Sequence, residues 1–147
     1  MNKMPRITSV RTSGQLRLEI DWNTKETLAV DLSTIITHNQ AFAPLTEPSF
    51  LNQVSIEEWG HGLDWPGGLD MGADRLYDLG REQSGLFSPS QLDEWMRRNG
   101  LSPTTTAMAL GITSHMISNY RHGARPIPRT IQLACIGWET EQLRKAA

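Results

Sequence analysis

The chain has 147 residues, of which 38% are hydrophobic, and a formal net charge of −2. This length suits one ordinary domain or two small ones, and the apolar fraction is enough for compact cores. No segment approaches the roughly 20 apolar residues that cross a bilayer, and the first residues lack the apolar core of a signal peptide, so we expect a cytoplasmic protein with no membrane partner. The single cysteine, Cys135, excludes an internal disulfide and a cysteine-rich zinc site, and we expect it to be a small core residue.

The start of the chain alternates between apolar and polar residues, as half-buried β-strands do. One strand is predicted over residues 15–22, whose apolar members lie two positions apart. A polar turn over residues 23–25 precedes a second alternating segment over 28–32, and an earlier strand is expected around Ile7 and Val10. These segments predict an antiparallel meander or hairpin.

Turn residues are frequent in the middle of the chain. Pro44 and Pro48 interrupt the strand pattern, and the apolar pair that follows, Phe50 and Leu51, predicts a short turn or helix. The expected elements that follow are a hairpin over 54–65, a turn over 65–68, a short helix from Met71 to Leu79, and a polar join between domains from Gly80 to Gly85.

Four short motifs of this half resemble those of a bacterial family of small β-rich domains of unknown function. They are the V-D-L segment at 30–32, the pair Leu45 and Phe50, the W-P-x-G-x-D segment at 65–70, and the L-Y pair at 76–77. The resemblance implies a fold and no catalytic residue. Its members occur alone or joined to DNA-binding modules.

Three polar residues around Trp59 are the candidate metal ligands of this half. Glu57, His61 and Asp64 carry carboxylate and imidazole groups that suit several divalent ions. A polar strand face explains them equally well, and the usual ligand spacings are absent. We therefore expect no metal and no other cofactor.

The second half of the chain carries helix start and stop signals. Ser88 is followed by a proline at the first helical position and by Gln91, which completes a capping box. Gly100 is the expected stop of this helix, and the Ser102-Pro103 pair repeats the start signal. Leu92, Trp95 and Met96 form the buried stripe of the first helix.

The run from Ala107 to Gly123 predicts two short helices packed across a tight turn. Gly111 suits the positive φ at the end of the first of them, and Thr113 can cap the second. Ile117 and Tyr120 lie three positions apart on the buried face of the second helix. An extended connection over 125–128 is then expected before a last helix, and five helical segments are expected in all. The apolar side of the last helix comprises Ile131, Ala134, Cys135 and Trp138.

Residues 101–133 resemble the Cro/C1-type helix-turn-helix family, including its A-x-x-x-G-I-x-x-x-x-I-S core at 107–118. The resemblance implies an all-helical, λ repressor-like domain whose second motif helix, over 114–121, enters the major groove. The residues that match or adjoin the base-contacting face are Ser114, His115, Ser118 and Asn119. The residues expected to contact phosphate are Thr104, Thr105, Arg121, His122 and Arg125. Two departures concern the phosphate contacts and the target sequence: Arg121 stands where the family very often has Glu, and three threonines at 104–106 replace the more usual Gln and Glu.

Charge divides the chain in the same place as the motifs. Residues 1–85 contain 7 basic and 12 acidic residues, a net charge of −5, whereas residues 86–147 contain 7 basic and 4 acidic residues, a net charge of +3. The basic half is the half with the DNA-binding pattern. Because its cations are few, a homodimer is the expected form that binds DNA.

We therefore expect an α+β chain with a β-rich domain over 1–85 and a helix-turn-helix domain over 86–147. The predicted function is a sequence-specific regulator that binds double-stranded DNA, antitoxin-like or autoregulatory in a bacterial operon. The first domain would supply dimerisation, a protein partner site or a small-ligand site. The alternative is a protein-interaction adaptor whose helix-turn-helix scaffold binds no DNA. An enzyme is not expected, because the nucleophile-elbow, phosphate-loop and zinc-helix motifs are absent.

Overall fold

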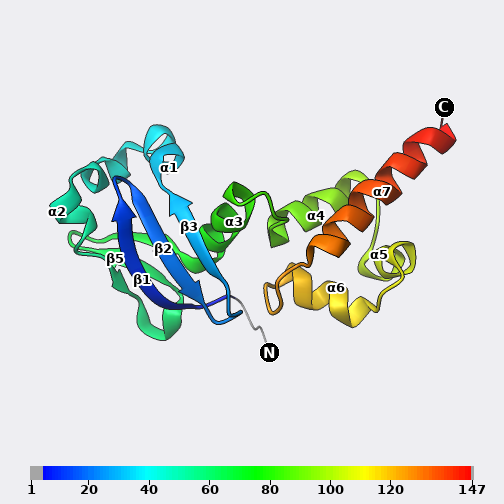
Figure 1. The fold of residues 1–147 in the computed structure, drawn as a ribbon, viewed down its shortest axis with the longest axis horizontal. Coiled ribbons are helices and arrows are strands. Elements are labelled where there is room, and N and C mark those ends of the chain that lie inside the picture. The colour runs from blue at the N-terminus through cyan, green and yellow to red at the C-terminus, as the bar shows by residue number, and fades with distance from the viewer. Residues whose placement is uncertain (1–4, 147) are drawn as a thin grey trace. The chain divides into compact units, whose positions relative to one another are not determined.

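The computed structural model describes residues 5–146, and these form two compact units (Figure 1). One unit spans Pro5–Gly85 and the other begins at Leu86. The fold is α+β, with antiparallel sheets in the first unit and several helices in the second. Within the described residues, none of the helices combines the length and the apolar content that a membrane span requires.

Two three-stranded antiparallel sheets form the frame of the first unit. The strands of the first sheet are β1 (Ile7–Gly14), β2 (Arg17–Trp22) and β3 (Thr27–Asp31), and those of the second are β4 (Ser55–Ile56), β5 (Gly62–Trp65) and β6 (Leu69–Gly72). The alternation predicted for β2 and β3 is confirmed, since Leu18 lies opposite Val30 and Ile20 opposite Leu28, with all four buried. Strand β2 begins at Arg17 because Leu16 has a φ of 57° in the preceding turn.

Short helices connect and cover these sheets. They are α1 (Ser33–His38), a 3₁₀ helix over Gln40–Thr46, α2 (Pro48–Leu51), a 3₁₀ turn over Glu58–Gly60, and α3 (Ala73–Gln83). The helix expected at Phe50 and Leu51 is α2, which starts at Pro48. The sequence patterns did not identify α1 or the 3₁₀ helix that follows it.

The predicted start and the predicted end of α3 were both wrong, although the first unit ends at Gly85, as expected. Met71 belongs to β6, where it pairs with Leu63, so α3 begins at Ala73. The helix then continues through Gln83, across most of the segment expected to be a linker. Gly80 explains this, because it lies against β3, where an added Cβ would be 3.0 Å from the Cβ of Leu28. The missing side chain therefore lets the helix pack closely on the sheet instead of ending it.

A buried polar contact reinforces that packing. Arg81 of α3 is 3% exposed and donates from Nη1 to Oε2 of Glu26, 3.0 Å away, in the turn between β2 and β3. The Tyr77 hydroxyl donates to the other oxygen of Glu26. Burial, followed by the contact with Glu26, raises the pKa of Tyr77. The Tyr77 ring also meets Trp22 edge to face, with centroids 5.1 Å apart.

Four helices make up the described part of the second unit, and not the five segments expected. They are α4 (Pro89–Arg98), α5 (Pro103–Leu110), α6 (Ser114–Arg121) and α7 (Arg129–Ala146). The capping box predicted at Ser88 and Gln91 is present at the start of α4, and Ser102 with Thr105 forms a second one at the start of α5. The residues between Arg125 and Pro128 form a connection without helix.

The core of this unit lies between α4, α6 and α7. Trp95 and Trp138 meet edge to face with centroids 5.5 Å apart, and Trp95 Nε1 donates to the Cys135 carbonyl, 3.1 Å away. Cys135 is fully buried, and burial raises its thiol pKa to about 12. This environment confirms the predicted core position of the cysteine and keeps the thiol protonated.

Candidate nucleic-acid interface

The turn between α5 and α6 sets the direction of α6. Gly111 closes α5 in the left-handed region, with a φ of 72°, as predicted. The Thr113 hydroxyl oxygen then accepts the N–H of Met116 at 3.1 Å and caps α6, also as predicted. These two local features let the chain turn within three residues and start a new helix.

Helix α6 has one face buried in the core and the opposite face accessible to solvent. Ile117 is fully buried and Tyr120 is 7% exposed, so both predicted inner residues lie in the core. Burial raises the pKa of the Tyr120 hydroxyl. The first residues of the opposite face, Ser114 and His115, are exposed.

Further along the outer face, two of the four candidate base-contacting residues are half-buried, Ser118 and Asn119. The Asn119 carbonyl accepts the N–H of Ala124 at 2.9 Å, but its side-chain amide has no hydrogen-bond partner within residues 5–146. Ser118 lies beside His122, whose Nδ1 is 3.2 Å from the Ser118 hydroxyl and 2.8 Å from its carbonyl oxygen. The structure thus places the four residues on one helix face and leaves Asn119 free to bond a partner.

The candidate phosphate contacts on α5 differ in what they already bind. Thr105 completes a capping box: its hydroxyl accepts the Ser102 N–H at 2.8 Å and its own N–H donates to the Ser102 hydroxyl at 3.1 Å. Thr104 is exposed at the same end of the helix and makes no such bond in the described structure. Of the two, Thr104 is therefore the side chain available to another molecule.

The candidate arginines differ in the same way. Arg121 Nε donates to Asp93 Oδ1 at 2.6 Å, which ties α6 to α4. Arg125 is exposed and forms no ion pair with any described residue. Sequence reasoning missed Asp93, and no spacing signals this contact, because 28 positions separate the two residues. The pair explains why a cation is accommodated at position 121, where the resembling family often has an acid.

No acidic residue occurs anywhere between Trp95 and Trp138, the segment that contains α5, the turn and α6. Acidic side chains from outside this segment pair with some of its cations: Arg98 binds Glu139 at 2.9 Å, and Arg97 binds Glu94 at 2.9 Å. The free positive charge of the outer surface is therefore modest but is not opposed by a carboxylate within the motif.

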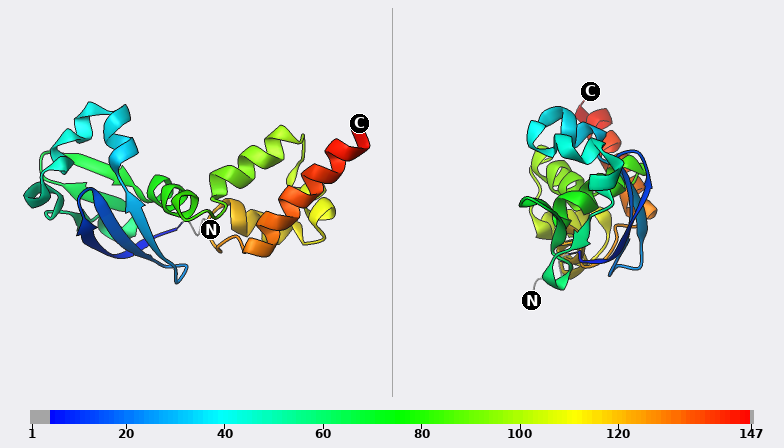
Figure 2. Two further views of the ribbon diagram at one scale, coloured as in Figure 1. Left: turned by 45° about the horizontal axis from the view of Figure 1, so that its top comes forward. Right: turned by 90° about the vertical axis from the view of Figure 1, so that its left-hand side faces the viewer.

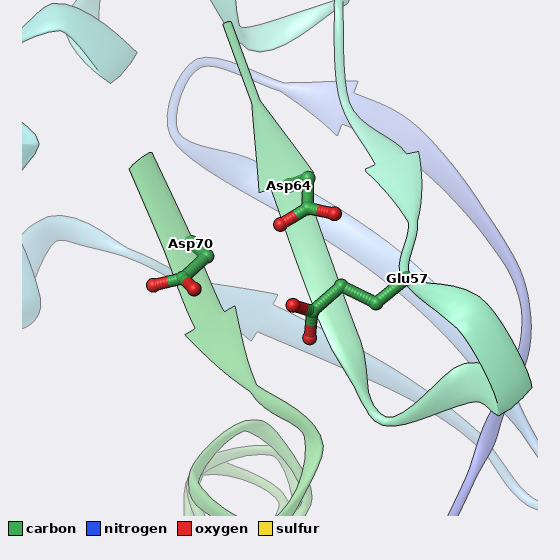
Figure 3. Close-up of side chains that lie close together, drawn as sticks. All are labelled: Glu57, Asp64 and Asp70. Carbon is green, nitrogen blue, oxygen red and sulfur yellow. The ribbon is translucent and has the colours of Figure 1, made fainter. Parts of the chain in front are cut away.

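The first unit carries a separate polar cluster (Figure 3). Glu57 follows β4, and Asp64 of β5 pairs across the strands with Asp70 of β6, so the three carboxylates share one face of the sheet. One oxygen from each lies within 4.8 Å of the others. The set differs from the candidate ligands of the sequence, because Asp70 joins the cluster and His61 does not.

Gly62, the first residue of β5, leaves room for the acidic cluster. A Cβ at Gly62 would collide with the Glu57 carboxylate. Burial, and then the negative charges of Asp64 and Asp70, raise the pKa of Glu57. Carboxylate oxygens suit hard cations, but exposed acidic groups often gather without an ion, so the cluster alone assigns no metal site.

A shallow hollow of about 220 Å³ lies between α1 and α3 of the first unit. Small-molecule sites enclose roughly 300–1,000 Å³. The hollow is smaller than such sites and is open to solvent.

Comparison with known proteins gives a similar solved structure and a matching family model. No curated protein matches the chain. A solved structure, called a "Putative DNA Binding Protein" from Nitrosomonas europaea ATCC 19718, is 40% identical to it, with a TM-score of 0.79, over 95% of this chain and 90% of that one. The family model described as "Protein of unknown function (DUF2442)" matches residues 7–82, more than half of the chain, and the protein belongs to that family.

Proposed function

We propose that the protein is a sequence-specific regulator that binds double-stranded DNA through a λ repressor-like, Cro/C1-type helix-turn-helix domain in its second unit. The observation that carries the proposal is the outer face of α6, which is polar, accessible at Ser114 and His115, and held on a capped helix. The 40% identical solved structure called a "Putative DNA Binding Protein" supports the same interpretation.

The dimensions and chemistry of α6 suit the major groove. An α-helix with its side chains is about 10–12 Å across, which is comparable with the major-groove width of roughly 12 Å. Asn119 can donate to and accept from the edge of an adenine, and His115 and the two serines can make shorter contacts to base edges. Thr104, His122 and Arg125 lie on flanking segments where phosphate contacts would set the orientation.

Arg121 has a lesser role in this proposal. Its guanidinium already binds Asp93, so its contact with phosphate would have to share or replace that pair. With few free cations, one protomer would bind weakly at physiological salt, and a homodimer on two half-sites would reach useful affinity. Such a protein would act as an antitoxin-like or autoregulatory component of an operon.

The test begins with selection of bound fragments from random duplex DNA, followed by titration of the selected duplex at several salt concentrations. Replacing Asn119 with Ala should cost about 1–3 kcal/mol, mainly at one base pair of the site. His115→Ala should weaken the selected duplex more than a scrambled one, whereas His38→Ala, a matched change in the first unit, should leave both unchanged. Absence of any complex at low salt would overturn the proposal.

The first unit favours a second candidate function, a protein-interaction adaptor without DNA binding. Trp59 is 71% exposed, and its backbone has a φ of 65°. Glu58 and Glu57, a member of the acidic cluster, directly precede it in the chain. An exposed aromatic ring beside carboxylates suits a basic protein segment. A stoichiometric protein complex that excludes DNA would favour this alternative. Neither proposal makes the protein an enzyme.

A further inference from the structure

His122 directly follows the last residue of α6, where the chain leaves the helix and turns toward α7 (Figures 1 and 2). Its side chain is exposed, and its Nδ1 lies 2.8 Å from the Ser118 carbonyl oxygen, one helical turn earlier. A carbonyl oxygen can only accept a hydrogen bond, so Nδ1 is the ring nitrogen that carries the proton. The Ser118 hydroxyl oxygen, 3.2 Å away, can accept from the same N–H. Ser118 therefore fixes the tautomer of His122 and leaves Nε2 on the other side of the ring.

This tautomer limits what the neutral His122 ring can bind. With the proton on Nδ1, the Nε2 atom of a neutral ring has only a lone pair. A DNA phosphate oxygen is also an acceptor, so the two atoms cannot form a hydrogen bond. Moving the proton to Nε2 would break the bond to Ser118 and set two lone pairs 2.8 Å apart. Nε2 becomes a donor without that loss only when the ring takes up a second proton and becomes a positively charged imidazolium ion.

Within residues 5–146, no hydrogen bond or ion pair joins His122 to a carboxylate that would hold this charge. Helix α5 packs against α6 and has no ionisable side chain. Helix α4 also packs against α6, and its ionisable side chains are paired: Asp93 with Arg121, Glu94 with Arg97, and Arg98 with Glu139. The other ionisable residues of α6 are His115, Tyr120 and Arg121, and Arg125 follows in the loop. The counter-ion that suits a charged His122 is therefore an external anion.

We propose that His122 contacts a DNA phosphate only as an imidazolium ion, so that DNA binding takes up at most one proton at His122 of each protomer. This inference rests on the proposed DNA-binding function and adds regulation by pH to it. An imidazole ordinarily changes its charge between about pH 5 and pH 8. Because the complex holds more protons than its free components, affinity should rise as the pH falls through that range. Uptake of one proton changes affinity by at most about tenfold per pH unit.

Fluorescence anisotropy of the full chain with a selected duplex tests the inference at pH 6 and pH 8, each over several salt concentrations. The wild type should bind more tightly at pH 6. Its slope of log affinity against log salt should also be steeper there by about 0.9 per protomer, because charged His122 displaces one more counter-ion. His122→Gln can donate to phosphate but carries no charge, so it should lose this change of slope. His122→Lys is charged at both pH values and should keep the steep slope at pH 8.

His38 supplies the matched control. It is exposed near the end of α1, and its Nδ1 makes the same contact, 2.8 Å from the Thr34 carbonyl oxygen. His38→Gln should therefore keep the pH dependence of the wild type. His115→Gln removes the other imidazole of α6 and should keep the part of the pH dependence that His122→Gln loses.

The outcomes separate this inference from the proposed function. If His122→Gln kept the pH-dependent change of salt slope, the role of His122 would be refuted while DNA binding would stand. Absence of DNA binding at both pH values would refute both. Circular dichroism would establish that the variants fold, and nuclear magnetic resonance of the imidazole nitrogens in the wild-type complex gives a readout that needs no variant. A bound His122 ring that is neutral, with its proton on Nε2, would also overturn the inference.

Discussion

At the scale of single residues, the most demanding contact is that of the half-buried Glu26 carboxylate with buried Arg81. The carboxylate accepts from Tyr77 and from Arg81, whose side chain is only 4% exposed, and so joins α3 to the turn between β2 and β3. A buried pair of this kind adds little relative to apolar packing, but loss of one partner leaves a charge without compensation.

Replacing Glu26 with Gln should therefore destabilise the first unit by about 3 kcal/mol, because the amide can still accept from Tyr77 but cannot neutralise Arg81. Urea denaturation measures the loss. The control is Glu19→Gln, which breaks an exposed pair with Arg11 on β1 and should cost at most about 0.5 kcal/mol. Equal losses in the two variants would contradict a structural role for the buried pair.

Neutralising the acidic cluster should have the opposite effect on stability from neutralising Glu26. Since burial and two neighbouring carboxylates raise the folded-state pKa of Glu57, the folded protein binds this proton more tightly than the unfolded chain does. Stability should fall as the pH rises from the ordinary value of 4.5 through the raised pKa. Glu57→Gln removes this loss and should raise the melting temperature at pH 7 by more than at pH 4.

The neighbouring exposed residue supplies the control for that measurement. Glu58→Gln changes the net charge equally but lies outside the cluster, so its effect on the melting temperature should be smaller at pH 7. If Glu57→Gln lowered the melting temperature at pH 7, the carboxylate would have a stabilising partner that this geometry does not provide.

At the scale of elements, the stability of α6 depends more on its Thr113 cap than on the composition of the helix. With only 8 residues, α6 would be marginal alone, and the Thr113 hydroxyl satisfies one of its free N–H groups. Thr113→Ala should cost about 1 kcal/mol of stability, and Thr113→Ser should restore most of it. Thr104→Ala, an exposed threonine that caps nothing, is the matched control. Thermal unfolding of the three variants would contradict the prediction if Thr113→Ala and Thr104→Ala were equivalent.

The elements that could be predicted from the sequence are those with local signals. Ser88, Ser102 and Thr113 mark helix starts through bonds within three residues, and the alternation of β2 depends only on its own side chains. Helix α1 escaped prediction because it has 6 residues and starts after Leu32 without a side-chain cap. The end of α3 was missed because Gly80 has the character of a stop, while its actual role depends on contact with Leu28, distant in the sequence.

The candidate sites likewise differ in how far the sequence predicts them, because only some depend on local spacing. The face of α6 follows from helix periodicity alone, so the spatial grouping of His115 and Asn119 could be predicted. The acidic cluster depends on the register that places Asp64 opposite Asp70, and the pairing of Arg121 with Asp93 joins two helices. Neither contact has a signature in the spacing of residues.

At the scale of the whole molecule, the acidic and basic residues are unevenly divided between a unit of the DUF2442 family and a helical unit with a segment free of acidic residues. This division has a direct consequence for DNA binding. Attraction to phosphate would come from the second unit, and its strength would depend on the few arginines that have no acidic partner. The salt dependence of binding should therefore be shallow for one protomer and roughly double for a dimer.

Arg125 is the arginine best suited to test this consequence. It is exposed, it lies four positions after the last residue of α6, and it forms no ion pair with any other residue of the described chain. Arg125→Ala should weaken binding to selected and unselected duplexes by the same factor and reduce the slope of log affinity against log salt by about 0.9 per protomer. Lys145→Ala removes the same charge from the last turn of α7 and should leave the slope nearly unchanged. Fluorescence anisotropy at four or more salt concentrations gives both slopes. If the two variants lost the same slope, attraction would arise from net charge alone, and the orientation proposed for α6 in the groove would lose its phosphate contact.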